Sequence, residues 1–264
     1  MKKCIKLICI SVAVLLCALP VHANGDTNED GRISLADLTC LINWLLNPNT
    51  SNNHAYVDLG LPSGTLWATQ NIGADGQYDS GAYIAWGETQ DKDTYTWQNY
   101  QWATADTTLT RYGKNSALWS SDDAANVLWG GLWRVPTLEQ WKELLSYCRW
   151  SWALVNGQYG YRISANGTGI FLPAAGYFRN DIHYEDNISG FYWARGTSAS
   201  DSLMAYGLYL DDSDYLWGYR YRYTGRNIRP VLQPSDLLRR FDVNGDDCVT
   251  QADVTALIQI LLER

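Results

Sequence analysis

The chain has 264 residues and a formal net charge of −8, with 18% charged and 13% aromatic residues, and its Trp (13) and Tyr (18) far outnumber Phe (4). These values exclude a disordered chain, which is rich in charge and poor in aromatics, and a coiled coil, which is rich in Ala, Glu, Lys and Leu. The acidic balance leads us to expect no nucleic-acid partner, because such proteins usually carry a basic patch. The remaining class is a globular protein whose Trp and Tyr rings suit binding surfaces as well as cores.

Residues 1–23 have the pattern of a secretory signal peptide. Lys2, Lys3 and Lys6 precede an apolar run, and cleavage is expected after Ala23, which takes the net charge from −8 to −11. The apolar run is too short for a transmembrane helix, and no later stretch is long enough, so we expect no membrane span. Lipid attachment at Cys17 is a weaker alternative. We expect a secreted, cell-surface or periplasmic protein.

Three cysteines remain after cleavage: Cys40, Cys148 and Cys248. An odd number in an exported protein does not indicate a disulfide framework, and at most one pair forms. No CxxC spacing occurs, so the sequence does not favour a zinc site.

Two acidic segments, 26–37 and 242–253, share one spacing of oxygen-bearing side chains. They occupy positions 1, 3, 5, 9 and 12, which is the ligand spacing of an EF-hand-type calcium loop, and position 7 adds a backbone carbonyl. Gly31 is at position 6 of the first loop, where the turn favours a positive φ, but Asp247 is there in the second, which should weaken that site. The predicted Ca²⁺ ligands are Asp26, Asn28, Asp30, Arg32 and Asp37, and then Asp242, Asn244, Asp246, Cys248 and Asp253, with Arg32 and Cys248 acting through their carbonyls.

Each loop precedes an apolar stripe at helical spacing. The stripes are Leu38, Leu41, Ile42, Leu45 and Leu46, and Val254, Leu257, Ile258, Leu261 and Leu262. Each fits one face of an amphipathic helix, and neither short helix would be stable by itself. We therefore expect the two helices to pack together. The alternatives are that the acidic turns only cap helices, or that calcium only clamps the termini together without any partner.

These two segments, 24–47 and 235–264, resemble the paired repeats of dockerin modules. The resemblance implies a small all-α, EF-hand-like module with two Ca²⁺ sites. It also implies docking to a cohesin-like partner, for which Asn43, Arg239 and Arg240 are candidates. Dockerin repeats are adjacent in sequence, whereas these two flank another domain.

Residues 48–55 form a polar, turn-rich stretch that predicts a linker, and the central domain covers 56–232. Its short apolar segments, bounded by Gly, Asn and Asp, indicate mostly strands and loops. In chain order we expect strands at 56–59 and 81–87, a helix to 148 behind a capping box at 137–140, hairpins at 159–172 and 205–223, and a closing strand at 227–231.

Six segments of the central domain occur in the order typical of one family: VDLGLPSGTLWA at 57–68, AWGE at 85–88, WRVPT at 133–137, FLPAAGY at 171–177, YW at 192–193 and IRPV at 228–231. Together they resemble the Fibrobacter succinogenes major paralogous domain. The resemblance implies an α+β domain of the C-type-lectin-like (formylglycine-generating-enzyme-like) fold, with its first and last strands side by side. It implies no settled activity, since the catalytic cysteine pair and the lectin calcium motif of related proteins are absent.

The sequence holds little that indicates catalysis. His54 and His183 have no neighbouring acid–base constellation, and GxSxG, HExxH and phosphate-binding glycine motifs are missing. We expect no enzyme. A pair of carboxylates for glycoside hydrolysis stays open, because its spacing is set in three dimensions.

Five rings alternate along one predicted strand, from Tyr215 through Trp217, Tyr219 and Tyr221 to Tyr223. Same-face residues in a strand lie roughly 6.6–6.8 Å apart, so the rings share a face. One interpretation places this face in the core. The other makes it part of a ligand site, whose candidate residues are Tyr215, Trp217, Tyr219, Arg195, Asp201 and Asp212.

The sequence therefore predicts a secreted, non-enzymatic binding or adhesion protein for a glycan or another cell-surface ligand, with a calcium-stabilised module split between its ends. Two alternatives remain: a docking component of a polysaccharide-degrading assembly, and an unrecognised carbohydrate-active enzyme.

Overall fold

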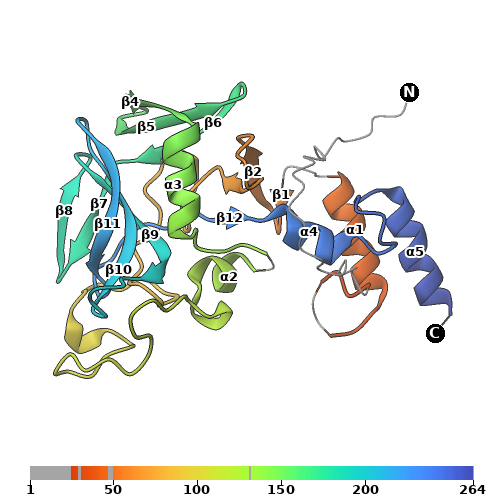
Figure 1. Cartoon of the computed structure of the whole chain (residues 1–264), viewed down its shortest axis with the longest axis horizontal. Coiled ribbons are helices and arrows are strands. Elements are labelled where there is room, and N and C mark those ends of the chain that lie inside the picture. Colours follow the sequence, from red (N-terminus) through yellow and green to blue (C-terminus); the bar gives the residue numbers. More distant parts are fainter. Residues whose placement is uncertain (1–24, 29–30, 47–49, 131, 264) are drawn as a thin grey trace. The chain divides into compact units, whose positions relative to one another are not determined.

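The computed structural model describes residues 25–28, 31–46, 50–130 and 132–263. The predicted signal peptide lies outside these residues. The described chain forms two compact units, one from the residues up to Leu46 and those from Ser235 onward, and one from 50 to Pro234 (Figure 1). The fold class is α+β. No helix in the described part is both long and apolar enough to cross a membrane.

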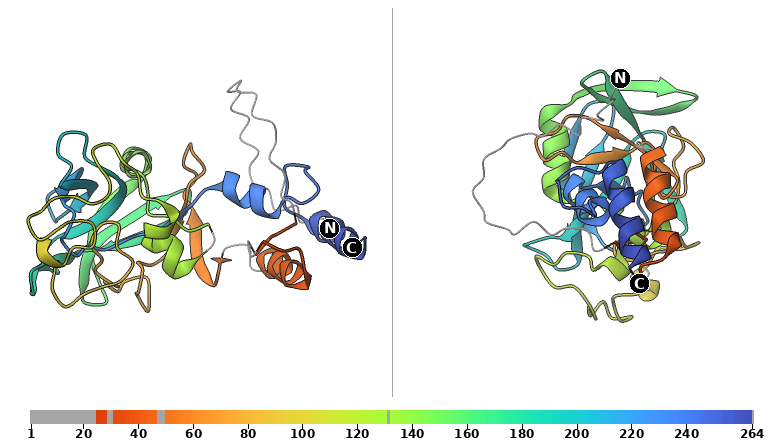
Figure 2. Two further views of the ribbon diagram at one scale, coloured as in Figure 1. Left: turned by 90° about the horizontal axis from the view of Figure 1, so that it is seen from below. Right: turned by 90° about the vertical axis from the view of Figure 1, so that its right-hand side faces the viewer.

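The described residues of the terminal unit form three helices, α1 (Leu35–Leu46), α4 (Pro234–Phe241) and α5 (Gln251–Leu262). The predicted pairing is confirmed, because α1 lies against α5 (Figure 2) and Leu41 and Leu257 are fully buried. The Trp44 ring stacks on Phe241 at 5.2 Å between centroids. Helix α4, which the sequence analysis did not predict, therefore supplies part of the core that joins the two halves.

The central unit contains short helices and three sheets in its described part. The helices are α2 (Ala124–Trp129), α3 (Leu138–Tyr147) and two 3₁₀ turns, η1 (Trp97–Asn99) and η2 (Ser120–Asp122). One sheet has the order β1-β2-β3-β12, from Thr50–Ser51, His54–Asp58, Leu66–Ala68 and Val231–Leu232. A second is the meander β4-β5-β6, from Arg149–Val155, Gln158–Ala165 and Thr168–Pro173.

The third sheet is curled and has the order β11-β10-β9-β7-β8. Its strands are β7 (Ala175–Arg179), β8 (Ile182–Asp186), β9 (Gly190–Thr197), β10 (Met204–Leu210) and β11 (Tyr215–Tyr221). Helix α3 packs against β9, β10 and β11. The core beneath it is rich in large rings, among them Trp67 and Trp141, whose centroids are 4.7 Å apart, and the fully buried Tyr192.

The strongest local signals are confirmed. Thr137 caps α3 in a capping box with Gln140. Asn166 and Gly167 have φ values of 50° and 79°, as the two-residue turn between β5 and β6 requires. The Asp211 carboxylate accepts the Ser213 and Asp214 N–H groups and closes the β10–β11 turn.

The strand predicted at 81–87 is wrong. Ala85 and Trp86 are buried, but the segment makes only an isolated bridge, from Ile84 to Arg226. Gly81 and Gly87 have φ values of 74° and 78° and turn the chain at both ends. The apolar run therefore predicted burial correctly, but the segment has no neighbouring strands in the described chain with which to form a sheet.

The closing strand is shorter than predicted, since only Val231–Leu232 pairs as a strand. This strand, β12, lies beside β3, which separates it from β2 in the same sheet. The predicted first strand, β2, and the predicted last strand, β12, therefore share a sheet but are not direct neighbours. Cys40, Cys148 and Cys248 form no disulfide within the described part of the chain.

Arg229 is fully buried just before β12 and binds no carboxylate among the residues that the structure describes. Its Nε donates to Asn71 Oδ1 (2.8 Å), and its Nη atoms donate to the carbonyls of Ala68 (3.1 Å) and Phe171 (2.8 Å). Burial lowers the pKa of Arg229 to about 10. One guanidinium therefore joins the end of β3, the following loop and β6.

We predict that Arg229→Met lowers the free energy of unfolding by roughly 3 kcal/mol, because three buried acceptors lose their donor. Urea denaturation followed by near-UV circular dichroism measures the change. The matched control is Arg162→Met at an exposed position of β5, expected within about 0.5 kcal/mol of the wild type. Equal effects of the two substitutions would contradict this role.

Candidate functional site

The first acidic loop is held by its own carboxylates. Asp26 Oδ2 accepts the Gly31 N–H (2.9 Å), and the fully buried Asp37 accepts the N–H groups of Asn28 (3.0 Å) and Ser34 (2.7 Å). Positions 1 and 12 of the loop thus bind the backbone of positions 6, 3 and 9. Asp30, a predicted ligand, lies outside the described residues, and Arg32 is exposed.

The second loop repeats this frame. Asp242 accepts the Asp247 N–H (3.0 Å), and the fully buried Asp253 accepts those of Asn244 (3.1 Å) and Thr250 (2.7 Å). The same positions, 1 and 12, bind positions 6, 3 and 9. Burial raises the pKa of Asp253. The two loops therefore share a backbone conformation as well as a residue pattern.

Position 6 has a left-handed backbone in both loops, with φ of 82° at Gly31 and 60° at Asp247. An Asp tolerates this conformation less well than Gly, which is consistent with a more strained second loop. Asp246 is exposed, and its Oδ1 accepts the N–H of Cys248, which is also exposed.

The loop donors are carboxylate, amide and carbonyl oxygens, the chemistry that Ca²⁺ prefers. Within the described residues, however, no group of three or more His, Cys, Asp or Glu side chains is placed to hold a metal ion. That statement does not cover the Asn244 amide or the position 7 carbonyls, and it does not cover Asp30, which lies outside the described residues. The donor types fit calcium, and its binding stays a prediction.

Of the three docking candidates, Arg240 is misassigned. It is 7% exposed, and its Nε donates to the Thr27 carbonyl. It lies in the terminal core because Thr27 and Phe241 surround it. Asn43 and Arg239 are exposed.

The aromatic row on β11 divides between core and surface. Trp217, Tyr219 and Tyr221 are 42%, 44% and 44% exposed. Lys142 of α3 lies over the Trp217 ring, its Nζ 4.6 Å from the centroid. Tyr206, on the neighbouring strand, contacts the rings of Trp217 and Tyr219 edge-on. These three exposed rings form what we call the aromatic row.

The two ends of the predicted five-ring face are structural. Tyr215 stacks on Trp150 with centroids 4.5 Å apart and contacts Tyr161, so it belongs to the main core. Tyr223 lies beyond the end of β11 and packs against Trp97 at 4.8 Å. The core interpretation therefore holds for the ends of the face and not for its middle.

The three polar candidates are not brought together. Asp212 is in the turn next to Tyr215, whereas Asp201 precedes Met204, which pairs with Tyr221 at the opposite end of the hairpin. Six residue steps along the strands separate these ends by about 20 Å. Arg195 donates to the Leu118 carbonyl and lies 3.9 Å from Asp123. These residues do not form one site with the row.

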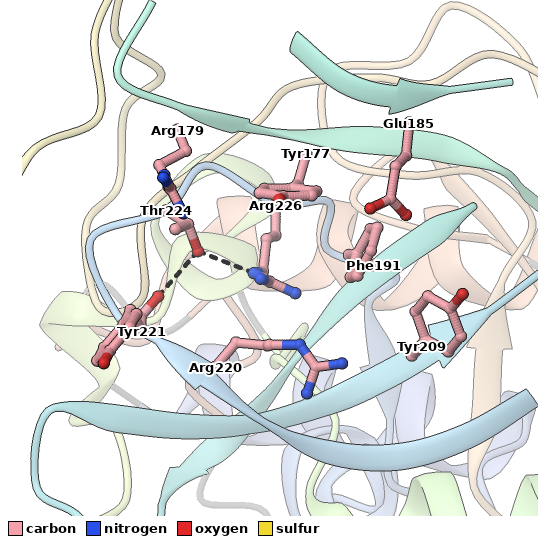
Figure 3. A pocket seen from close by; sticks show the side chains of 9 residues that line it. All are labelled: Tyr177, Arg179, Glu185, Phe191, Tyr209, Arg220, Tyr221, Thr224 and Arg226. Carbon is pink, nitrogen blue, oxygen red and sulfur yellow. Dashed lines mark hydrogen bonds between the residues drawn. The ribbon is translucent and has the colours of Figure 1, made fainter. Parts of the chain in front are cut away.

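A cavity of about 340 Å³ lies inside the curled sheet, and the sequence analysis missed it (Figure 3). Tyr177 of β7, Phe191 of β9, Tyr209 of β10 and Tyr221 of β11 supply its rings. We call it the arginine pocket, because its charged lining residues are Arg179, Arg220, Arg226 and Glu185.

Arg226 lies at the bottom of the arginine pocket and is 5% exposed. Its guanidinium carbon is 5.2, 4.8 and 4.9 Å from the ring centroids of Tyr177, Phe191 and Trp193. Its Nε donates to Thr224 Oγ1 at 2.9 Å, which is the only hydrogen bond of its side chain within the described chain. Burial, and then the like charge of Arg220, lower the pKa of Arg226 to about 9, so it stays protonated at pH 7.

One signal for this pocket was available in the sequence. In a strand whose odd positions form one face, the even positions Gly218 and Arg220 form the other, and an arginine there faces away from the ring row. The rest of the pocket comes from β7, β8 and β9, which were not predicted, from Tyr209 of β10, and from Thr224 and Arg226 after β11.

Three comparisons with known proteins gave no match: no family model, no curated protein and no solved structure is similar to this chain.

We predict that Trp217→Ala changes the free energy of unfolding by no more than about 0.5 kcal/mol, because the ring is 42% exposed and lies outside the main core. Tyr215→Ala should cost about 2 kcal/mol, because it removes a stacked, half-buried ring. Thermal unfolding of the two variants tests this division of the strand. A larger loss for Trp217→Ala than for Tyr215→Ala would show that the row is core.

Proposed function

We propose that this is an exported, non-enzymatic protein that binds carbohydrate through the aromatic row, with a terminal unit stabilised by calcium. The observation that carries the proposal is the exposure of Trp217, Tyr219 and Tyr221 on one face of β11. Each of these rings leaves more than two-fifths of its surface exposed, and three of them side by side form an apolar surface that a ligand would cover.

The row suits a chain of sugars. Rings at alternate strand positions are roughly 6.6 to 6.8 Å apart, and so they form a line of apolar faces along the strand. Sugar rings have apolar C–H faces that stack on such surfaces, while their hydroxyls stay in water. Lys142, whose Nζ lies over the Trp217 ring, supplies a donor for those hydroxyls.

Binding is favoured over catalysis by the surroundings of the titratable groups. His54 stacks on Trp129 at 3.8 Å, and burial lowers its pKa. His183 stacks on Phe178 at 4.4 Å. The arginine pocket has Glu185 as its one lining carboxylate among the described residues, whereas glycoside hydrolysis uses two.

The central unit belongs, in this proposal, to the C-type-lectin-like fold and to the Fibrobacter succinogenes major paralogous domain that its six segments resemble. The α+β class, the capping box before α3 and the return of the chain to β3 through β12 are compatible with that assignment.

In the terminal unit, Ca²⁺ would be held by Asp26, Asn28, Asp30, Asp37 and the Arg32 carbonyl, and by Asp242, Asn244, Asp246, Asp253 and the Cys248 carbonyl. Both position 12 carboxylates are fully buried, which is costly without a neutralising charge. A bound dication would supply that charge and link each loop to its helix.

A second candidate function is docking to a cohesin-like partner through the paired helices. One observation favours it: apolar side chains of α1 and α5 are exposed, with Leu35 and Leu46 at 72% and Leu262 at 81%. A partner would cover them.

We predict that the protein is retained by insoluble or gel-embedded polysaccharides in affinity electrophoresis. Trp217→Ala should reduce retention at least ten-fold, because it removes the largest ring of the contact. The control is Trp119→Ala, another exposed tryptophan (60%) outside β11, which should leave retention unchanged. Release of reducing ends in the same samples would contradict the non-enzymatic assignment, and equal retention of both variants would overturn the row as the site.

We predict that a chelator lowers the melting temperature of the terminal unit and that millimolar CaCl₂ restores it, because a ligand that binds only the folded state stabilises it. Differential scanning calorimetry measures the shift. Asp253→Asn is expected to weaken the response more than Asp236→Asn, a change at a half-buried aspartate outside the loops. No shift at millimolar calcium would refute the calcium sites.

A further inference from the structure

We propose that the arginine pocket is a second binding site, which takes the carboxylate of an acidic sugar, a hexuronic acid unit, with Arg226 as its principal ligand. Arg220 and Trp217 lie on opposite faces of β11, so the charged residues of the pocket are separate from the Trp217 end of the aromatic row, although Tyr221 of the row also lines the pocket. The inference therefore does not depend on the function proposed for the row.

The first argument is the unpaired charge of Arg226. A buried cation without a counter-ion is costly, and such groups are normally paired with an anion. No carboxylate of the described residues forms an ion pair with Arg226, and its Nη atoms have no hydrogen-bond partner there. A ligand carboxylate would satisfy both nitrogens in a bidentate contact.

The second argument is preorganisation. The rings of Tyr177, Phe191 and Trp193 surround the guanidinium at 4.8–5.2 Å and offset part of its desolvation. The Thr224 hydroxyl, itself bound to the Tyr221 carbonyl, fixes Nε. The two Nη atoms are thus held in place before any ligand arrives, which lowers the entropy lost on binding.

The third argument is the charge around the opening. Arg179 and Arg220 are exposed on the rim, and Glu185 is the one acidic lining residue, so the charged lining is positive overall. Glu185 has a φ of 57°, which is uncommon for this residue type, and its side chain points into the pocket (Figure 3). Its carboxylate would repel a dianion such as a phosphate ester but would accept hydrogen bonds from sugar hydroxyls.

The fourth argument is size and lining. At about 340 Å³ the pocket is near the lower end of the roughly 300–1,000 Å³ range of small-molecule sites. That volume suits one or two sugar units. The rings of Phe191, Tyr177 and Tyr209 offer apolar surface to a pyranose, and Arg220 and Glu185 offer polar partners to its hydroxyls.

The experiment is isothermal titration calorimetry of the full protein with a matched set of probes. Methyl β-D-glucuronide, methyl β-D-glucoside and the 6-sulfate of that glucoside differ only at C6, and acetate supplies a carboxylate without a ring. We expect the glucuronide to bind at least ten-fold more tightly than each of the other three. Arg226→Met should abolish that preference, and Arg226→Lys, which keeps the charge but not the planar fork, should restore only part of it.

Circular dichroism checks that the Arg226 variants are folded. If they are not, Arg220→Met, an exposed position on the rim, tests the same site and should weaken glucuronide binding at least three-fold. Equal binding of glucoside and glucuronide would overturn the role of the carboxylate. Equal binding of sulfate or of acetate would overturn the uronic acid assignment, and unchanged binding by a folded Arg226→Met would overturn the site.

Trp217→Ala separates this inference from the proposed function. It should leave glucuronide binding unchanged, while Arg226→Met should leave retention on neutral polysaccharide unchanged. If the glucuronide results contradict the arginine pocket, the retention results still test the aromatic row, and the reverse also holds.

Discussion

The fold depends on a buried guanidinium at the place where the central unit closes. Arg229 binds the end of β3, the following loop and β6 from a position just before β12. It thereby holds β12 beside β3, so that the chain enters and leaves the unit through the same sheet. Two chain segments that leave from the same sheet start close together, so little loop entropy is lost when they meet. Helices α1 and α5 can therefore pair although a whole domain separates them in sequence.

Several buried arginines in this molecule donate hydrogen bonds to backbone carbonyls of other segments. Arg222 donates to the Tyr112 and Ser202 carbonyls, Arg229 to those of Ala68 and Phe171, and Arg240 to that of Thr27. Each of these three satisfies the main chain of another segment. Arg226 differs, because its side chain contacts rings and one hydroxyl and donates to no carbonyl of the described residues. That contrast separates a structural arginine from one placed to bind something else.

Local chemistry was predictable from the sequence and assembly was not. The capping box at Thr137, the turn at Asn166 and the periodic stripes of α1 and α5 depend on neighbouring residues, and all three are confirmed. The run at 81–87 has the apolarity of a strand, but strand identity requires a partner, and the chain there bridges only at Ile84. The arginine pocket could not be foreseen, because its residues come from five separate segments. The sequence predicted that the rings of the aromatic row share one face of a strand. It could not predict their exposure, because that depends on how far α3 extends over β11.

The alternation of β11 has a consequence for how sequence length changes would act on this molecule. The Asp211 carboxylate sets the four-residue turn that fixes the pairing of Tyr215 with Leu210 and of Tyr221 with Met204. A slip by one residue would exchange the two faces of the strand along its whole length. Arg220 would then stand among the exposed rings, and Tyr219 would fill the pocket. A single turn therefore determines which side chains occupy each face of β11. A one-residue insertion there would be more disruptive than a substitution at any ring.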